Sequence, residues 1–139
     1  MDMNTPEAAL TQHAPMLGGL VTYLSVSDAA AASEFYQRAF GAAEQLRMGE
    51  PGQIMHLHLH VNGSSLMLSD PFPQHGHPHR DPAGYTLHLM VDSADAGFKR
   101  AVEAGATEVM APHDAFWGDR YAQVRDPFGV DWAFVSRLG

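Results

Sequence analysis

Hydrophobic residues recur at helical spacing in two stretches of this chain. In the first stretch the apolar positions are Ala32, Phe35, Tyr36, Ala39 and Phe40. They follow the order i, i+3, i+4, i+7 and i+8, which places them on one face of a helix. Ser27 or Asp28 can cap the start of this helix, and Gly41 can end it. The pattern therefore predicts a helix near residues 28–40.

The second stretch repeats the first. Its helical positions are Ala94, Phe98, Ala101, Val102 and Gly105. They predict a helix near residues 93–104 that stops at a glycine. Asp28 and Asp92 are 64 residues apart, and so are Gly41 and Gly105. A strand-like segment precedes each helix, "LVTYLSVSD" and then "YTLHLMVDS". The order of strand, helix and "GA" therefore occurs twice, which indicates a duplicated unit.

Three short strand-like segments follow each helix, with turn signals that include "GEPG", "NGSS" and "DPFG". Each half therefore predicts a βαβββ module, and the fold class is α+β. Two such modules packed side by side can share one core and leave a groove. We expect a loose leader over residues 1–16 and a single domain over 17–137. Its modules span about 17–70 and 84–137, and the Pro- and Gly-rich stretch 71–83 predicts the linker.

The composition narrows the classes of function. A chain of 139 residues with 45% hydrophobic positions is expected to form one globular domain. Sixteen Asp and Glu against eight Lys and Arg argue against nucleic acid or anionic membrane as a partner. The absence of cysteine excludes disulfides and thiol chemistry. No apolar run approaches the length of a membrane span, and the start lacks a signal-peptide pattern, so we expect a cytoplasmic protein.

Four motifs within the duplicated frame resemble a known family: "EFYQRAFGA", "LMLSDP", "FWGDRY" and "DPFGVDW". Over about residues 17–137 the chain resembles the vicinal oxygen chelate superfamily. That superfamily includes glyoxalases, bleomycin and fosfomycin resistance proteins and extradiol dioxygenases. "FWGDR", and "DPFG" followed two residues later by Trp, are similar to its PhnB-like branch. The resemblance implies two tandem βαβββ modules that form a curved mixed sheet around a ligand groove. It also implies a homodimer, which would cover exposed sheet edges.

The resemblance further implies where metal-dependent members hold a divalent ion, on the first and last strands of each module. Carried over to this chain, the four positions fall on Val21, Met67, Thr86 and Ala133. None of them is a carboxylate or an imidazole, and Thr86 offers only a hydroxyl, so they do not suit a hard divalent cation. Val130 also stands where many PhnB-like proteins have histidine. We therefore expect neither the family metal nor another cofactor.

A run of alternating histidines suggests a different site. In "IMHLHLHV", His56, His58 and His60 would share one face of a strand. Histidine is the commonest metal ligand. The outer two would lie roughly 13 Å apart along the strand, however, and the neighbouring "SSLMLS" offers no Asp, Glu or Cys. We expect a polar pocket wall and not a metal site. The histidines of "HGHPH" are expected in a solvated linker loop.

The strand faces turned away from the helices predict the remaining pocket residues, because apolar walls with a few polar groups are typical of small-molecule sites. His88 is either a core histidine or the one weak catalytic candidate, since its charge can change near neutral pH. Trp117 either stacks on a flat ligand at the groove mouth or anchors its loop. The predicted ligand-binding residues are Tyr23, His56, His58, Met67, His88, Met90, Trp117, Tyr121 and Gln123.

Two turn motifs are expected to have structural roles. Asp119 and Arg120 of "FWGDRY" are expected to fix their loop by an ion pair. In "DPFG", Asp126 can bond its own backbone while Pro127 sets the turn, and we assign this turn no catalytic role.

Three functions remain open from the sequence, which does not decide whether the chain is an enzyme. The first is a binding protein of the glyoxalase and bleomycin resistance type that takes a small organic molecule without the superfamily metal. The second is an enzyme of that superfamily, a lyase, isomerase or dioxygenase, that uses a relocated metal or a histidine acid–base group. The third is a protein with a vestigial pocket and an interaction role. No GxSxG, P-loop or GxGxxG motif supports another chemistry.

Overall fold

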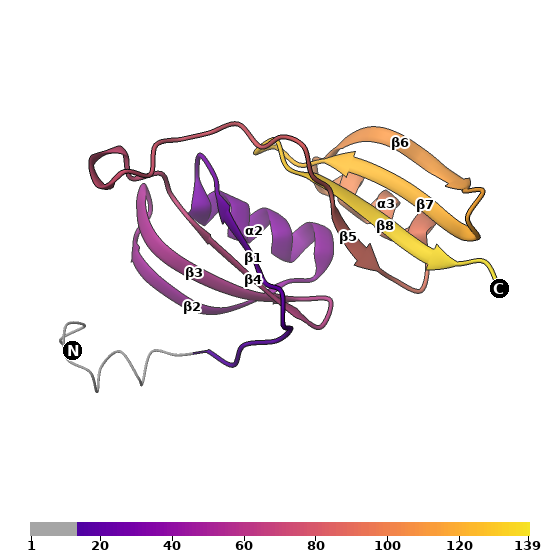
Figure 1. Ribbon diagram of the computed structural model, residues 1–139, viewed down its shortest axis with the longest axis horizontal. Coiled ribbons are helices and arrows are strands. Elements are labelled where there is room, and N and C mark those ends of the chain that lie inside the picture. The colour runs from indigo at the N-terminus through magenta and orange to yellow at the C-terminus, as the bar shows by residue number, and fades with distance from the viewer. Residues whose placement is uncertain (1–13) are drawn as a thin grey trace.

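The computed structural model describes residues 14–139, and it contains the two predicted modules in tandem (Figure 1). The first module consists of β1 (Thr22–Ser25), α2 (Ala29–Phe40), β2 (Ala43–Glu50), β3 (Gln53–Val61) and β4 (Ser64–Ser69). The second consists of β5 (Leu87–Met90), α3 (Ala94–Ala104), β6 (Thr107–Asp114), β7 (Asp119–Arg125) and β8 (Asp131–Arg137). A short 3-10 helix, η1 (Pro73–His75), lies in the segment that joins them. Residues 1–13 of the predicted leader fall outside the described part of the chain.

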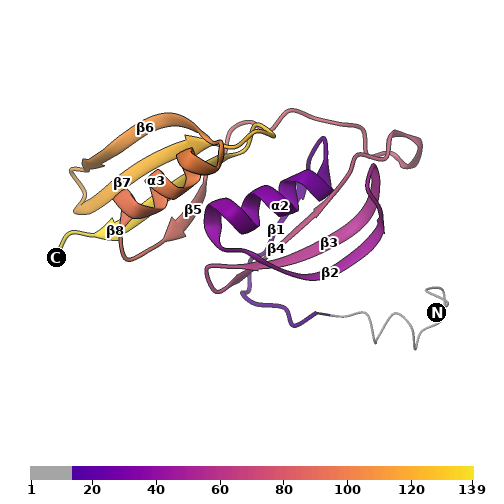
Figure 2. The same cartoon turned by 180° about the vertical axis from the view of Figure 1, so that it is seen from behind.

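Each module forms its own four-stranded mixed sheet, in the orders β1-β4-β3-β2 and β5-β8-β7-β6. The first and last strands of each module pair in parallel and the other neighbours are antiparallel. Both helices lie on the same side of the molecule, behind the sheets in Figure 1 and in front of them in Figure 2. The two predicted βαβββ modules are confirmed. Their strands form two four-stranded sheets, one in each module, and not one continuous sheet. The face of each sheet without a helix is called its helix-free face below.

The two helices begin at side-chain caps that show where the repeat is imperfect. Asp28 accepts a hydrogen bond from the Ala31 N–H, and Gly41 ends α2 with a left-handed φ of 71°. At α3 the cap is Ser93, which accepts from the Ala96 N–H, and not Asp92. The two caps are therefore 65 residues apart, whereas the terminating glycines are 64 apart, because α3 is one residue shorter than α2.

The modules share one hydrophobic core on their helix sides. Phe40 of α2 packs against Trp132 of β8 with ring centroids 4.4 Å apart, and Tyr36 lies 5.2 Å from the same ring. Leu57 and Leu68 close this core from the first sheet. The two helices also contact each other directly, since the Arg100 Nε–H donates a hydrogen bond to the Arg38 carbonyl at 2.8 Å. Among residues 14–139 no helix is long and apolar enough to span a membrane.

Replacing Gly97 by alanine is expected to destabilise the protein although alanine favours helices by about 1 kcal/mol. A Cβ at this α3 position would lie 2.5 Å from Cδ1 of the buried Phe134 ring. Because that ring is held in the shared core, the overpacking should cost about 1–3 kcal/mol in unfolding free energy. Urea denaturation measures it, with Ala96→Gly on the exposed side of α3 as the control for propensity alone. A Gly97→Ala protein more stable than wild type would contradict the packing of α3 on β8.

Candidate functional site

The strand registers divide the side chains of each sheet into two faces, as the alternation predicted. Leu57, Leu59, Leu66 and Leu68 all enter the core. On the helix-free face of the first sheet, Tyr23, Met67 and His58 stand side by side on β1, β4 and β3. On the second sheet, His88, Ala133 and Gln123 form the corresponding row on β5, β8 and β7.

The nine predicted ligand-binding residues therefore fall into two groups. The first sheet holds Tyr23, His56, His58 and Met67, and the second holds His88, Met90, Tyr121 and Gln123. Trp117 lies in the turn between β6 and β7, against the second group. The hydrogen bonds and ring contacts described next lie within one group or the other.

The histidine strand is more covered than the sequence suggested. His58 is only 2% exposed, and its Nε2 lies 2.7 Å from the Ser65 Oγ, which also accepts from the Leu17 N–H at 2.8 Å. The His60 Nε2–H donates to the Pro15 carbonyl at 2.7 Å. Residues 15–17, where the predicted leader meets the domain, thus pack on β3 and β4. His58 therefore lies beneath this segment and not on an open pocket wall. Strand alternation assigned His58 to a face of the sheet, but it could not show which residues cover that face.

His56 and Tyr23 form the accessible part of the first group. The Tyr23 Oη lies 3.1 Å from the His56 Nδ1, and the two rings are 5.7 Å apart. Tyr23 is 48% exposed, so this pair can still meet a ligand. Partial burial lowers the pKa of His56 and raises the pKa of Tyr23. Both shifts favour the neutral forms at neutral pH, in which the pair offers hydrogen bonds and not charge.

The stability of the protein should fall on acidification partly through His58. Burial, and then the neighbouring His60 and His56, lower the pKa of His58 below its ordinary value. The unfolded chain, with a pKa of about 6.5, therefore takes up the proton first. Neutral His58 contributes stability that is complete above about pH 6.5 and is lost as the pH falls through the lower folded pKa. In urea denaturation between pH 7.5 and 5, His58→Gln should flatten the decline, whereas His75→Gln in the exposed linker should leave it unchanged. An equally steep decline in both variants would refute this role.

An aromatic cluster occupies the helix-free face of the second sheet. The Tyr121 ring lies at its centre, with centroids 5.8 Å from His88, 5.9 Å from His113 and 5.8 Å from Trp117, all edge to face. Trp117 is 53% exposed and the neighbouring Met90 is 51% exposed. We name Tyr121, Trp117, His88 and His113 the Tyr121 cluster. It brings together three predicted residues and one, His113, that the sequence reasoning missed.

His113 escaped notice because it lies in "MAPHD", where proline and the absence of regular alternation hide the strand. The register of β6 against β7 is irregular on both sides of Met110. His113 nevertheless pairs with Tyr121 across the two strands. The sequence feature that could have identified His113 is the hairpin on either side of "FWGDRY". In an antiparallel hairpin, a histidine just before this motif lies across from the tyrosine that ends it.

Ion pairs hold the loop that carries Trp117, though not the pair that the sequence suggested. Arg120 binds Asp95 of α3 and Asp114 of β6, both at 3.0 Å. Asp119 instead lies 3.2 Å from Arg137, at a geometry that leaves its buried Oδ1 without a well-aligned hydrogen bond. Adjacent residues on a strand point to opposite faces, so Asp119 and Arg120 reach different partners. The loop is therefore tied to α3, to β6 and to the C-terminal end of β8.

Asp126 of "DPFG" has the structural role that was predicted and a second one that was not. Its Oδ1 accepts from the backbone of Phe128 and Val130 at 2.8 and 2.9 Å. Its Oδ2 accepts from the Tyr36 hydroxyl at 2.6 Å and from the Trp132 indole at 2.9 Å. Because Tyr36 belongs to the first module, this buried carboxylate also joins the two modules.

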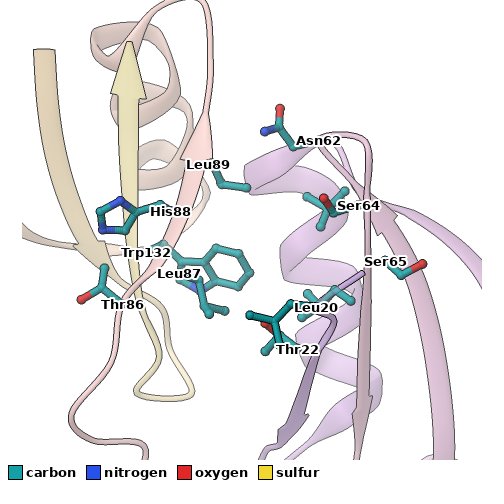
Figure 3. A pocket seen from close by; sticks show the side chains of 12 residues that line it. Leu20, Thr22, Asn62, Ser64, Ser65, Thr86, Leu87, His88, Leu89 and Trp132 are labelled. Carbon is teal, nitrogen blue, oxygen red and sulfur yellow. The ribbon is translucent and has the colours of Figure 1, made fainter. Parts of the chain in front are cut away.

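A cleft of about 250 Å³ lies between the modules, on the core side of β5. Figure 3 shows Leu87, Leu89 and Trp132 reaching toward the first module, while the His88 ring lies on the other side of its strand. The Asn62 Nδ2 donates to the Met90 carbonyl across the two modules at 3.0 Å. Of the predicted ligand-binding residues only His88 borders this cleft. The cleft and the rings of the Tyr121 cluster therefore lie on opposite faces of β5, and His88 is the residue that borders both.

The residues at the implied metal positions do not fit a divalent cation. Val21 and Met67 are half-buried apolar side chains, Ala133 is fully buried, and Thr86 offers one hydroxyl. Among residues 14–139, moreover, no three His, Cys, Asp or Glu side chains gather closely enough to hold a metal ion. The linker histidines are exposed, and His79 instead contacts Asp81 at 3.2 Å. No step of a metal-dependent reaction can be assigned to these side chains.

Comparison with known proteins agrees with this fold. The protein Rv0887c of Mycobacterium tuberculosis is 45% identical over 121 residues, which cover 82% of this chain and 71% of that protein. The crystal structure of TioX from Micromonospora sp. ML1 matches with a TM-score of 0.70 at 28% identity, over 87% of this chain and 99% of TioX. The PhnB protein from Bacillus cereus shares the fold, with a TM-score of 0.65 at 18% identity. The match covers 86% of this chain and 99% of the PhnB protein.

The family model that matches this chain is described as the Glyoxalase/Bleomycin resistance protein/Dioxygenase superfamily, and it spans residues 18–134. The match runs from before β1 into β8 and includes all four motifs that carried the resemblance. With its duplicated βαβββ architecture, the chain belongs to the glyoxalase/bleomycin resistance protein/dioxygenase superfamily.

Proposed function

We propose that this protein binds a small aromatic organic molecule on the helix-free face of its second module, without the superfamily metal. The observation that supports this most directly is the Tyr121 cluster. Aromatic rings that stand edge to face around an exposed centre offer faces on which a flat ligand can stack. Met90 beside them supplies an apolar side chain that adapts to ligands of different shape.

The rigidity of the site supports binding over a vestigial role. The three ion pairs of Arg120 and Asp119 hold the Trp117 loop against α3, β6 and the C-terminal end of β8. A preorganised site loses less conformational entropy when a ligand binds. Trp117 is more than half exposed despite this support, and an aromatic ring that only anchored its loop would be expected to pack inward.

Indole is a suitable probe, since the natural ligand is unidentified. Trp117→Ala should weaken indole binding about tenfold, because a ring-to-ring contact contributes roughly 1.4 kcal/mol. Tyr23→Ala, on the helix-free face of the first module, is the matched control and should change the affinity less than twofold. Calorimetric or NMR titration measures both. Loss of binding in Tyr23→Ala with none in Trp117→Ala would move the site to the first module and overturn the proposal.

The absence of a metal requirement is tested separately. Protein purified without a histidine tag and dialysed against a chelator should retain its affinity for indole within twofold. Elemental analysis of the undialysed protein should find less than about one tenth of an equivalent of zinc, nickel, manganese or iron. Stoichiometric metal that is required for binding would favour the enzymatic alternative.

We also propose a homodimer in the cytoplasm as the working form. Large apolar side chains are exposed on both modules, among them Met55 at 64% and Met90 at 51%. The edges of β1 and β5 are unpaired within the described sheets, and natural proteins usually cover such edges. Light scattering at micromolar concentration should give twice the chain mass of 15.1 kDa. A species of 15.1 kDa alone would contradict the dimer.

A further inference from the structure

A row of hydrogen bonds runs along the helix-free face from the Tyr121 cluster to the sheet end. The Arg125 guanidinium donates to Asp131 twice, from Nε at 2.7 Å and from Nη2 at 3.1 Å. The Gln123 Nε2 donates to the Asp131 Oδ2 at 3.3 Å. The Tyr121 hydroxyl donates to the Gln123 Oε1 at 3.0 Å. Each member of this row is therefore tied to the next.

The chemistry of the groups fixes the direction of every bond in the row. A guanidinium can only donate, and the carboxylate that it holds in two bonds can only accept. The Gln123 amide must therefore turn its nitrogen toward Asp131 and its oxygen toward Tyr121. The proton of Tyr121 is committed to that oxygen. Burial, and then the charge of Asp131, raise the pKa of Tyr121, so the phenol keeps this proton near neutral pH.

The free side of the Tyr121 oxygen can consequently only accept. His113 has the same character, because its Nδ1 lies 2.9 Å from the Ala111 carbonyl. That carbonyl can only accept, so Nδ1 carries a hydrogen, and in the corresponding neutral tautomer Nε2 is an acceptor. Tyr121 and His113, two rings of the cluster, thus each offer an acceptor. A ligand that brought another acceptor, such as a carboxylate, would leave these groups unpaired.

We infer that the Tyr121 cluster selects aromatic ligands that carry an N–H or O–H donor on the ring, such as indoles and phenols, and discriminates against their methylated or anionic counterparts. This inference rests on the proposed function, since it names the ligand class of the same site. The net charge of −8 disfavours anionic ligands in the same direction.

Indole and N-methylindole test the inference, because they share ring size and differ in the donor. Indole should bind wild-type protein about fivefold more tightly, which corresponds to one hydrogen bond of roughly 1 kcal/mol. Tyr121→Phe keeps the ring and removes the acceptor, so it should lower the affinity for indole to that for N-methylindole. Its affinity for N-methylindole should stay within twofold of wild type. Gln123→Leu frees the Tyr121 proton and should also shrink the difference between the two probes.

The outcomes separate this inference from the proposed function. If indole and N-methylindole bind wild type equally while Trp117→Ala weakens both, the donor selection is wrong and the aromatic site stands. If neither probe binds, or Trp117→Ala changes neither affinity, both the selection and the site are refuted. A preference for indole that survives in Tyr121→Phe would also overturn the assignment of Tyr121 as the acceptor.

Discussion

Asp126→Ala is expected to lower the free energy of unfolding by about 3–5 kcal/mol, because it removes the acceptor of four hydrogen bonds, three buried and one partly buried. The Tyr36 hydroxyl, the Trp132 indole and two backbone N–H groups would lose their partner together. Burying unpaired donors is costly since the unfolded chain hydrates them. A loss of this size is a large part of the total stability of a domain, which is typically about 5–15 kcal/mol.

Two variants help to interpret the Asp126 result in urea denaturation. Tyr36→Phe removes only the bond between the modules and should cost about 1 kcal/mol. Asp92→Ala is the control for loss of an acidic side chain, because Asp92 is exposed and does not cap α3. It should change the unfolding free energy by less than about 0.5 kcal/mol. If Asp126→Ala behaved like Asp92→Ala, the turn would not join the modules as described.

Gly49→Ala should be comparably damaging, with a loss of about 3–5 kcal/mol. Its φ of 104° is unfavourable for any residue with a side chain, and a Cβ there would lie 2.3 Å from the Gln53 carbonyl oxygen. Strain of this kind costs about 1–3 kcal/mol, and a clash with backbone adds a similar amount because backbone cannot turn aside.

Gly52 in the same hairpin separates the two causes. Its φ is 86°, yet no atom lies within 4 Å of the Cβ that an alanine would add. Gly52→Ala should therefore show the conformational strain alone, about 1–2 kcal/mol. The difference between the two variants measures the clash. An equal loss of unfolding free energy in both variants would show that Gly49 is needed only for its φ. The backbone of the β2–β3 bulge would then move to accommodate the added Cβ.

The helices and the duplication were predictable because local patterns determine them. Apolar residues at helical spacing located both helices to within one residue at their start, and Gly41 and Gly105 ended them as expected. The caps show the limit of such reasoning. Asp92 and Ser93 are both good caps, and the local pattern does not decide which of them begins the helix, whereas the structure places Ser93 there.

The site was only partly predictable, because its geometry depends on pairing between distant segments. Alternation placed Tyr121 and Gln123 on the correct face, but it did not show that Asp131 and Arg125 orient them. His113 became part of the cluster only through the β6–β7 hairpin. His58 had the correct face and the wrong surroundings, since residues 15–17 cover it. Such long-range contacts leave no periodic signal in the sequence.

The division into two sheets also had no local signal. Each module can complete its own four strands, and the modules are joined by their shared core and by hydrogen bonds such as those of Tyr36 with Asp126 and Asn62 with Met90. These residues have ordinary local roles as a helix core position and a turn asparagine. Their partners belong to the other module, so the sequence could not show that they join the sheets.

Mapping the indole site by NMR tests the central claim most directly. In a titration of ¹⁵N-labelled protein, the largest shifts should fall on His88, Met90, Trp117 and Tyr121, including the side-chain N–H of Trp117. The buried indole of Trp132 should move little. Shifts concentrated on Thr22, Asn62 and Leu89 at the cleft, or on Tyr23 and His56 of the first sheet, would contradict a binding site on the helix-free face of the second module.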